Sequence, residues 1–363
     1  MSPRLAAAGA NEAPPLPVVQ SVTPLGTVQQ NPVINMRDNA QSTLFKGRSV
    51  WTFGDTDLSV PNAKGSYWDD NSLSWSDDLD ASDGIRLEHD LADSSAVPRE
   101  YLPYTPAEAR YNYNHDQKHC TQTPCGAEFA LWSAQLVADP ARDRLLLFYP
   151  EVWRVSGRPD WRLVGSGIAV WTRAEGFTRP VENPGSPTPT LMWSDSEVSY
   201  IGGSLSVADT LYSYGCSPDW IVMHCRLARV PLAGALDKSQ WRYYAGGDNW
   251  SADENGAVTV FDGGAAANSV FYVPYLGEYL AIYSQPFTDD VMYRVAEHPW
   301  GPWSEAGLLF TGLPGSQNNF DYSAVAHPEF SQGSGRVQYV TYVRTTGFLQ
   351  QEIRLVRVVF DDP

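Results

Sequence analysis

The 363-residue sequence has little positive charge and no long apolar run. It holds 25 Lys and Arg against 42 Asp and Glu, which gives a formal net charge of −17. Nucleic-acid binding needs a positive surface that neutralises phosphates, and no cluster of basic residues interleaved with aromatics is present. No apolar run reaches the roughly 20 residues that span a bilayer. We therefore expect a soluble chain with no nucleic-acid partner and no membrane insertion.

The motifs of several enzyme classes are also missing. The sequence contains no GxSxG elbow, no P-loop and no GxGxxG, so nucleophilic-serine and nucleotide chemistry have no support. The acidic run at 76–84 fails the EF-hand pattern, because Asp83 stands where that loop needs Gly. His115 and His119 lack the regular ligand spacing of a structural zinc site. We expect no cofactor and no metal.

Cysteine is scarce, and its four residues form two close pairs. Cys120 with Cys125 and Cys216 with Cys225 both have spacings that suit local disulfides, the second across a hairpin. Disulfides persist in exported proteins, so we expect a secreted protein; free thiols are the alternative. The Ala- and Pro-rich segment 1–30 lacks the apolar centre of a secretory signal, and we expect it to be a flexible leader.

Aromatic and turn-forming residues are abundant. The sequence has 13 Trp, 19 Tyr, 13 Phe, 29 Gly and 27 Pro, and few stretches show a helical period, which favours short strands joined by turns. One unit, an apolar strand, a tight polar turn and a Tyr-, Leu- and Val-rich strand, returns five times. Its second strands begin near Arg48, Arg144, Thr210, Glu278 and Arg336. The interval between one repeat and the next leaves room for two further strands. Four strands per repeat make a propeller blade.

We therefore predict an all-β fold, a five-bladed β-propeller with four antiparallel strands per blade, as a single domain over 31–363. The blades are expected near 34–98, 126–185, 195–246, 260–312 and 320–361. A β-sandwich or a jelly roll would also use short strands and is the alternative. The polar segment 93–125 is expected to be a long loop outside the first blade, of a length that is often functional.

A pair of acids stands out in the stretch 37–56, RDNAQSTLFKGRSVWTFGDT. This stretch predicts a hairpin about Lys46-Gly47, and a turn centred there places Asp38 opposite Asp55. Opposed residues hold their Cβ atoms roughly 4.5–5.5 Å apart, and like charges so placed are destabilising. Glycoside hydrolysis uses two carboxyl groups, one to protonate the leaving oxygen and one to attack the anomeric carbon or activate water. We predict this catalytic pair. Alternatively, Asp38 caps a turn or pairs with a neighbouring Arg, and Asp55 closes a bend.

Further polar and aromatic residues are candidates for substrate binding. Acids that precede inner strands of later blades would lie near the same channel mouth, and these are Glu128, Asp195, Glu197 and Asp321. Two residues of the last blade could orient a sugar hydroxyl, Tyr322 and His327, although a histidine before Pro328 could equally be an ordinary hydrogen-bonded one. Aromatic rings in polar contexts could stack on sugar faces, or pack between blades instead, and these are Tyr67, Trp68, Trp193 and Trp250.

Three stretches carry a resemblance to a known family. The stretch 37–56, the later YSAVAHPEF followed by VQYVTYV, and HPWGPW at 298–303 resemble a group of exported five-bladed propellers. That group was long labelled a domain of unknown function, and some members are endo-D-arabinanases. The resemblance implies a secreted glycoside hydrolase that cleaves an extracellular polysaccharide, such as an arabinan.

More loosely, the chain is similar to the arabinanase and β-xylosidase propellers. In those, a catalytic Asp opens the inner strand of blade one and a Glu acid sits in blade three. Asp38 matches the first position, but YIGGSLSV contains no Glu, and Glu197 lies four residues before Ile201. This departure leaves Asp55 as the substitute acid, with the roles of the two aspartates exchangeable. The rival functions are a lectin-like propeller without turnover and an interaction scaffold.

Overall fold

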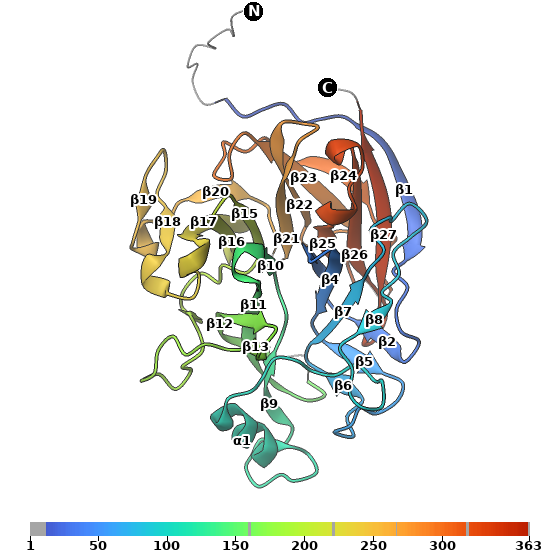
Figure 1. Ribbon diagram of the computed structural model, residues 1–363, viewed down its shortest axis with the longest axis vertical. Helices are drawn as coiled ribbons and strands as arrows, with labels where there is room; N and C mark the ends of the chain where they lie inside the picture. The colour runs from blue at the N-terminus through green and yellow to red at the C-terminus, as the bar shows by residue number, and fades with distance from the viewer. Residues whose placement is uncertain (1–11, 159–160, 220–221, 266, 317–318, 362–363) are drawn as a thin grey trace, which may run out of the picture.

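A computed structural model describes residues 12–158, 161–219, 222–265, 267–316 and 319–361, and these residues form β-strands for the most part (Figure 1). The first sheet contains β3 (Gln41–Phe45), β4 (Arg48–Phe53), β7 (Ser72–Ser76) and β8 (His89–Asp90). A small sheet continues the same hairpin, with β2 (Ile34–Arg37), β5 (Thr56–Leu58) and β6 (Trp68–Asp69).

The next two sheets are larger. The second contains β9 (Ala127–Leu131), β10 (Leu136–Asp139), β11 (Arg144–Val155), β12 (Trp161–Thr172), β13 (Gly176–Thr178) and β14 (Trp193–Ser194). The third contains β15 (Gly203–Val207), β16 (Thr210–Asp219), β17 (Val222–Pro231), β18 (Arg242–Tyr244), β19 (Trp250–Ser251) and β20 (Thr259–Asp262). The third sheet thus extends beyond the predicted blade end at residue 246, because β20 pairs with β17.

The last two sheets complete the arrangement. The fourth contains β21 (Asn268–Val273), β22 (Glu278–Ser284), β23 (Asp290–Ala296) and β24 (Gly307–Thr311). The fifth contains β25 (Tyr322–Ala326), β26 (Val337–Gly347), β27 (Gln350–Phe360) and β1 (Val19–Thr27). Short 3-10 helices lie at Pro140–Arg142, Leu232–Gly234, Lys238–Gln240, Glu254–Gly256, Pro328–Phe330 and Gly333–Gly335.

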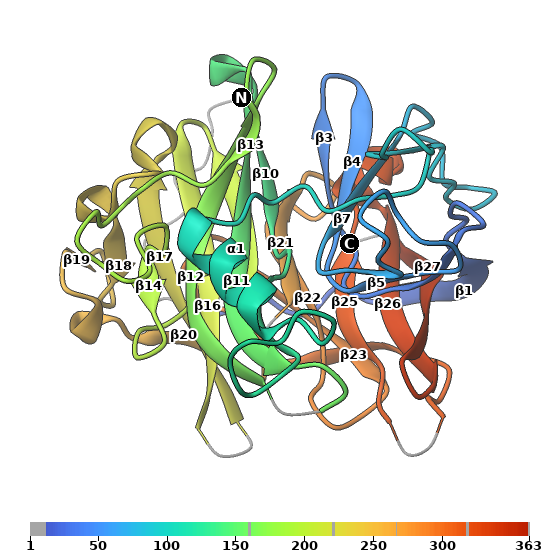
Figure 2. The ribbon, with the colours of Figure 1, turned by 90° about the horizontal axis from the view of Figure 1, so that it is seen from below.

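The larger sheets follow one another around the molecule, so that the first, in blue, lies beside the last, in red (Figures 1 and 2). Each is built on consecutive antiparallel strands, as propeller blades are. The inner strands β3, β10, β15, β21 and β25 contact one another in that order. The predicted all-β, propeller-like fold is therefore confirmed.

Strand β1 corrects the prediction that residues 1–30 are a flexible leader; residues 1–11 lie outside the described residues. Val19–Thr27 pairs antiparallel with β27, from Val19 opposite Phe360 to Thr27 opposite Arg354. The physical reason is the free edge of β27, whose unpaired N–H and C=O groups accept another strand. The N-terminal segment thereby supplies the fourth strand of the fifth sheet.

The segment 93–125 also differs from the predicted loop, because it contains helix α1 (Pro106–His115). The helix begins with a capping box: the Thr105 hydroxyl accepts from the Glu108 backbone N–H, and the Glu108 carboxylate accepts from the Thr105 N–H. Pro106 occupies the first helical position, where its missing N–H costs nothing. In the described part of the chain, no helix has the length and apolarity needed to cross a membrane.

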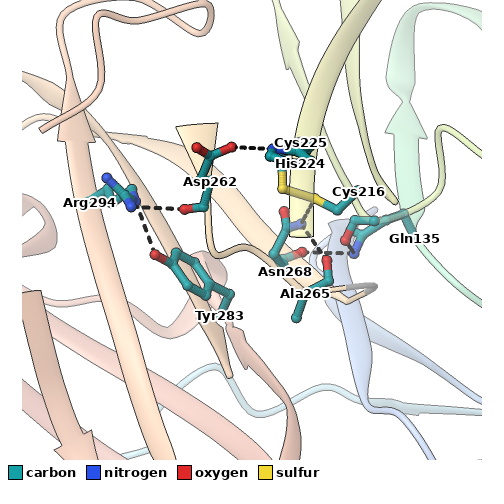
Figure 3. Close-up of a disulfide and its surroundings, with 10 residues drawn as sticks. Gln135, Cys216, His224, Cys225, Asp262, Ala265, Asn268, Tyr283 and Arg294 are labelled. Atoms are coloured by element: carbon teal, nitrogen blue, oxygen red, sulfur yellow. Dashed lines mark hydrogen bonds and ion pairs between the residues drawn. A yellow bond between two sulfur atoms is a disulfide. The ribbon is translucent and has the colours of Figure 1, made fainter. Parts of the chain in front are cut away.

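The predicted disulfides are both present, Cys120–Cys125 and Cys216–Cys225. Cys216 and Cys225 are directly opposed on β16 and β17. Figure 3 shows this disulfide beside Asn268 at the start of β21. Close by, the Gln135 side chain donates to the backbone carbonyls of Gly202 and Asn268, at 3.0 Å each. This amide joins the second, third and fourth sheets near their inner strands.

A polar cluster joins the first and last sheets. The Ser42 and Ser49 hydroxyls both donate to Glu329 Oε1, at 2.5 and 2.6 Å. His327 Nδ1 lies 2.6 Å from the Ser42 hydroxyl, and its ring stacks on Trp51 at 4.1 Å. Because these contacts link β3 and β4 to the segment after β25, they close the ring of sheets.

We expect Glu329→Ala to lower the free energy of unfolding by about 2 kcal/mol, because two serine hydroxyls lose a charged acceptor. Glu329→Gln keeps Oε1 as an acceptor and should cost less than about 1 kcal/mol. Urea unfolding of the two variants measures both values. Equal losses in the two variants would contradict the assignment of the closing contacts to Glu329 Oε1.

Candidate active site

Asp38 and Asp55 lie opposite each other, as the hairpin register predicts. β3 pairs with β4 from Gln41 opposite Thr52 to Phe45 opposite Arg48. At the acids, the Asp38 N–H donates to the Asp55 carbonyl at 2.9 Å, and the Gly54 N–H donates to the Asp38 carbonyl at 2.8 Å. The ladder breaks beside them, where Asn39 has a φ of 53°, in the left-handed region that Asn tolerates.

Asp55 is held by three N–H donors. Arg154 donates to Oδ1 and Oδ2 at 2.9 and 3.0 Å, and the Trp132 and Trp68 indoles donate to Oδ1 at 3.0 and 3.3 Å. Burial raises the pKa of Asp55, and Arg154 and the two indoles oppose that rise. Since Oδ2 accepts only from Arg154 among the described residues, it keeps a lone pair for water or a substrate.

Arg154 lies near the end of β11 and carries three carboxylates at once. Besides Asp55, it pairs with Asp70 through Nη2 and with Glu128 through Nε at 2.8 Å. The guanidinium side chain is 14% exposed, so water screens these pairs weakly. One positive charge against three negative ones leaves the site strongly acidic.

Asp70 is the most buried member of this group. The Tyr104 hydroxyl donates to Asp70 Oδ2 at 2.6 Å, and the Asp70 N–H donates to the Glu100 carboxylate at 3.3 Å. Burial raises the pKa of Asp70 well above its ordinary value; Arg154 lowers it, and the charges of the neighbouring acids raise it further. Asp70 thus orients Arg154 from the side that faces the protein interior.

Asp38 has a different environment from its partner. Its residue is only partly exposed, and its Oδ1 is buried with no hydrogen-bond partner in the described part of the chain. Burial and then the Asp55 charge raise the pKa of Asp38 to about 6, whereas hydrogen bonds from Tyr322 and the Asn39 backbone lower it. Asp38 is therefore the carboxyl group that exchanges its proton near mildly acidic pH.

Some of the other predicted site residues gather around this pair. The Trp68 indole donates to Asp55, and Glu128 pairs with Arg154, which also binds Asp55. Tyr322 is hydrogen-bonded to Asp38. Tyr67, next to Trp68, is 55% exposed. The Glu128 side chain is 34% exposed, which makes it the most accessible of the Arg154 partners. The segments that join the first sheet to the small sheet, together with β6, β9 and the start of β25, thus contribute to one site.

His327 and Trp193 do not lie at this site. His327 is fully buried, with Nδ1 on Ser42 and Nε2 on Thr341, and burial lowers its pKa to about 3. Trp193 is fully buried and packs edge-to-face against Trp241 in the core. Neither ring can reach a sugar, because the surrounding sheets cover both.

Trp250 and Asp321 also lie away from the acid pair. The Trp250 ring packs under Arg229, 4.0 Å from the guanidinium, and against Trp300. Asp321 is 3% exposed, and burial followed by the charge of Asp289 raises its pKa to about 7.

The remaining acids of blade three are separate from the acid pair. Glu197 forms an ion pair with Lys238, at 2.5 Å between Oε1 and Nζ. Asp195 is exposed.

Four residues of the site were missed from the sequence: Arg154, Asp70, Trp132 and Tyr104. Arg154 and Trp132 lie in stretches whose sequence is typical of an ordinary strand and turn, so neither residue stands out. Asp70 lies in the polar run 69–71. The usable signal was the position of Asp70 two residues after Trp68, a residue already predicted to contact the substrate.

One group of side chains has metal-ligand chemistry, Asp77, Glu88 and His89, whose ligand atoms lie within 4.8 Å of one another. All three residues are exposed, and Arg48 Nε already donates to Asp77 Oδ1 at 2.6 Å. Asp77 is thus already paired with Arg48, and His89 Nε2 lies 3.4 Å from its other oxygen, so we assign no metal to this group.

Comparisons with known proteins place the chain among familiar folds. Residues 169–346, just under half of the chain, match the model of a family described as Domain of unknown function (DUF4185). This agrees with the resemblance to a group once labelled in that way. No curated protein matches the sequence.

Several solved structures are similar over most of the chain. A Bacteroides ovatus ATCC 8483 protein, provisionally described as a hydrolase, is 17% identical, with coverage of 98% of this chain and 96% of its own and a TM-score of 0.58. The family 117 glycoside hydrolase Zg3597 of Zobellia galactanivorans is 10% identical, with coverage of 94% and 91% and a TM-score of 0.53. The GH43_1 enzyme of Xanthomonas citri complexed with xylotriose is 15% identical, with coverage of 93% and 90% and a TM-score of 0.51. At these identities the similarity is one of fold.

We expect Asp55→Asn to lower the pKa of Asp38 below about 6, because the Asp55 charge is one of the two causes that raise it. Carboxyl-carbon NMR titration of Asp38 measures the change. Asp57→Asn is the matched control, since the Asp57 carboxylate is hydrogen-bonded to Asn35 on the adjacent strand. A pKa of Asp38 that stays the same in Asp55→Asn would show that the two carboxyls do not interact.

The raised pKa of Asp38 also affects how the stability of the folded protein depends on pH. A carboxyl whose pKa is raised in the folded state binds protons there that the unfolded chain has released. The pKa of Asp38 is 3.8 in the unfolded chain and about 6 in the folded protein. As pH rises between these two values, the Asp38 carboxyl therefore makes the folded protein less stable. Urea unfolding across this window should show a flatter pH dependence in Asp38→Asn than in the unchanged protein.

Proposed function

We propose that the protein is a secreted glycoside hydrolase that cleaves an extracellular polysaccharide at the Asp38–Asp55 pair, on a five-bladed propeller. The opposed and electrostatically coupled carboxyls carry this proposal, because glycosidic bonds are cleaved by two such groups. The five larger sheets, in strand order, support the five-bladed description. The two disulfides support export.

The unequal environments of the two acids support a division of roles. Asp55 accepts from Arg154 and two indoles, which favour its carboxylate form. Asp38 has no cation on it in the described part of the chain and has a pKa of about 6. We assign Asp38 as the group that gives its proton to the leaving oxygen, and Asp55 as the anion that faces the anomeric carbon or the attacking water. This is the exchanged form of the expected assignment, in which Asp38 was the base or nucleophile.

The proposed reaction is a hydrolysis, which consumes one water molecule for each glycosidic bond cleaved. The bond between the anomeric carbon and the leaving oxygen breaks, the leaving oxygen takes the Asp38 proton, and water supplies the hydroxyl of the new reducing end. Asp38 then recovers a proton from water. Tyr322, through its hydrogen bond to Asp38, is placed to hold that carboxyl while its charge changes.

The comparisons support the substrate class. A GH43_1 enzyme bound to xylotriose and a family 117 glycoside hydrolase share the fold. The resemblance of the first and last blades favours a furanoside polysaccharide such as an arabinan within that class. Glu128, Trp68 and Tyr67 are the proposed substrate contacts, since they lie beside the pair with accessible surface.

We expect Asp38→Asn and Asp55→Asn each to reduce kcat by about 100-fold or more, the contribution of a positioned acid or base. Release of reducing ends from a panel of purified polysaccharides, with chromatography of the products, measures the activity. Asp57→Asn should keep full activity. Glycan binding without product from the unchanged protein would instead establish a lectin-like module, and activity retained in both Asn variants would remove the pair from the mechanism.

The pH profile tests the division of roles. If Asp38 donates the proton, the activity falls as pH rises through about 6, because the acid form is lost. In Asp55→Asn the residual activity should begin to fall at a lower pH. A profile whose activity falls as pH drops through 6 would instead make Asp38 the base.

A further inference from the structure

A cavity of about 390 Å³ lies beside the third sheet, apart from the acid pair. Its volume falls within the roughly 300–1,000 Å³ of small-molecule sites. Its charged and phenolic lining comes from β17, β18 and the segments before β15 and around two 3-10 helices, and comprises Glu197, Arg226, Lys238, Tyr243, Asp253 and Glu254.

Arg226 is a cation of this cavity whose charge interacts with Glu254 but which makes no direct hydrogen bond or ion pair through its guanidinium in the described part of the chain. Its Nε is buried and has no hydrogen-bond partner among the described residues, and none of the ion pairs in that part of the chain involves its guanidinium. A guanidinium offers five N–H donors in a planar fork that matches a carboxylate. A partly buried Arg without a protein acceptor therefore indicates an acceptor supplied from outside.

Two phenols lie near Arg226, and of these Tyr243 lines the cavity whereas Tyr200 lies behind its wall. The Tyr200 side chain is fully buried, and its hydroxyl has no partner in the described part of the chain. That hydroxyl lies close enough to interact with the charges of Glu254 and Arg226. The Tyr243 hydroxyl accepts from Trp193 Nε1 at 3.4 Å and keeps its own proton to donate.

The acids of the cavity, by contrast, already have donors. Glu197 is neutralised by Lys238, Asp253 accepts from the Asn255 N–H at 3.0 Å, and Glu254 Oε1 accepts from the Val198 N–H at 2.7 Å. The backbone donors satisfy Asp253 and Glu254 without cancelling their charge, and Arg226 is the charged donor of the lining that still lacks a direct acceptor.

We propose that this cavity binds the carboxylate of an acidic sugar, with the Arg226 guanidinium and the Tyr243 hydroxyl, both of which line it, on the carboxylate oxygens. The polar lining favours a sugar over an apolar acid, because Glu254 Oε2 and Asp253 can accept from ring hydroxyls. A hexuronate unit of a polysaccharide has this chemistry. The site is separate from Asp38 and Asp55 and needs no turnover.

Isothermal titration with D-glucuronate tests the proposal, with D-glucose as the neutral probe and D-glucosamine as the cationic one. The unchanged protein should bind glucuronate at millimolar concentration or better and should bind the other two sugars more weakly. Arg226→Gln should weaken glucuronate binding by about tenfold or more, since it removes a charged hydrogen-bonding partner. Glu254→Gln should keep or strengthen it, because a like charge is removed.

Arg229→Gln is the matched control, because it removes the same charge from the same strand while Arg229 packs on Trp250 instead. Its binding should be unchanged, and circular dichroism with thermal melting confirms that both Arg variants fold. Equal binding of glucose and glucuronate, preference for glucosamine, no binding of glucuronate, or undiminished binding in Arg226→Gln would each overturn the proposal. Because the measurement is of binding, it stands or falls independently of hydrolysis at Asp38 and Asp55.

Discussion

The ion pair between Arg154 and Asp55 is the contact on which the candidate site depends. Arg154 comes from β11 of the second sheet and Asp55 from the bend between β4 and β5, so a single guanidinium both ties the second sheet to the first hairpin and fixes one of two opposed acids. Without that cation, Asp55, Asp70 and Glu128 would hold three negative charges in a poorly solvated space, which no local hydrogen bond could offset. The same cation makes the acids unequal, because it favours the charged form of Asp55. Burial, and then that Asp55 charge, raise the pKa of Asp38.

The hairpin and the acid pair were predictable because they are local. Lys46 and Gly47 both have positive φ, as a two-residue hairpin turn requires, and Gly47 signals that turn in the sequence. Once the turn is fixed, the period of two fixes every opposed pair down to Asp38 and Asp55. The repeats were predictable for the same reason, since each strand-turn-strand unit contains its own pattern. The Cys216–Cys225 disulfide likewise follows from opposed positions in one hairpin.

The electrostatic partners were not predictable, because they lie far apart in the sequence although their sheets are neighbours. Arg154 lies 99 residues from Asp55 and 84 from Asp70, and nothing in its strand distinguishes it from a surface arginine. The burial of two predicted substrate-binding residues could not be predicted from the sequence either. His327 and Trp193 have residue types that suit sugar contact, yet both are fully buried by neighbours from other parts of the chain. Strand β1 was missed because its partner β27 comes at the opposite end of the sequence.

The two acidic regions of the molecule differ in how their charge is compensated, and this difference underlies the two roles that we propose for them. Around Asp55, three carboxyl groups share the single Arg154 guanidinium. The nearby Asp38 carboxyl has no cation beside it among the described residues and exchanges its proton near pH 6. Around Glu197, the acids have their own donors, and Arg226 is left over. An excess of carboxylate chemistry suits bond cleavage, whereas an unused guanidinium suits binding of an anion. Both regions combine a cation on a strand, Arg154 on β11 and Arg226 on β17, with acids on neighbouring segments, so the same scaffold can supply either property by changing which charge lacks a partner.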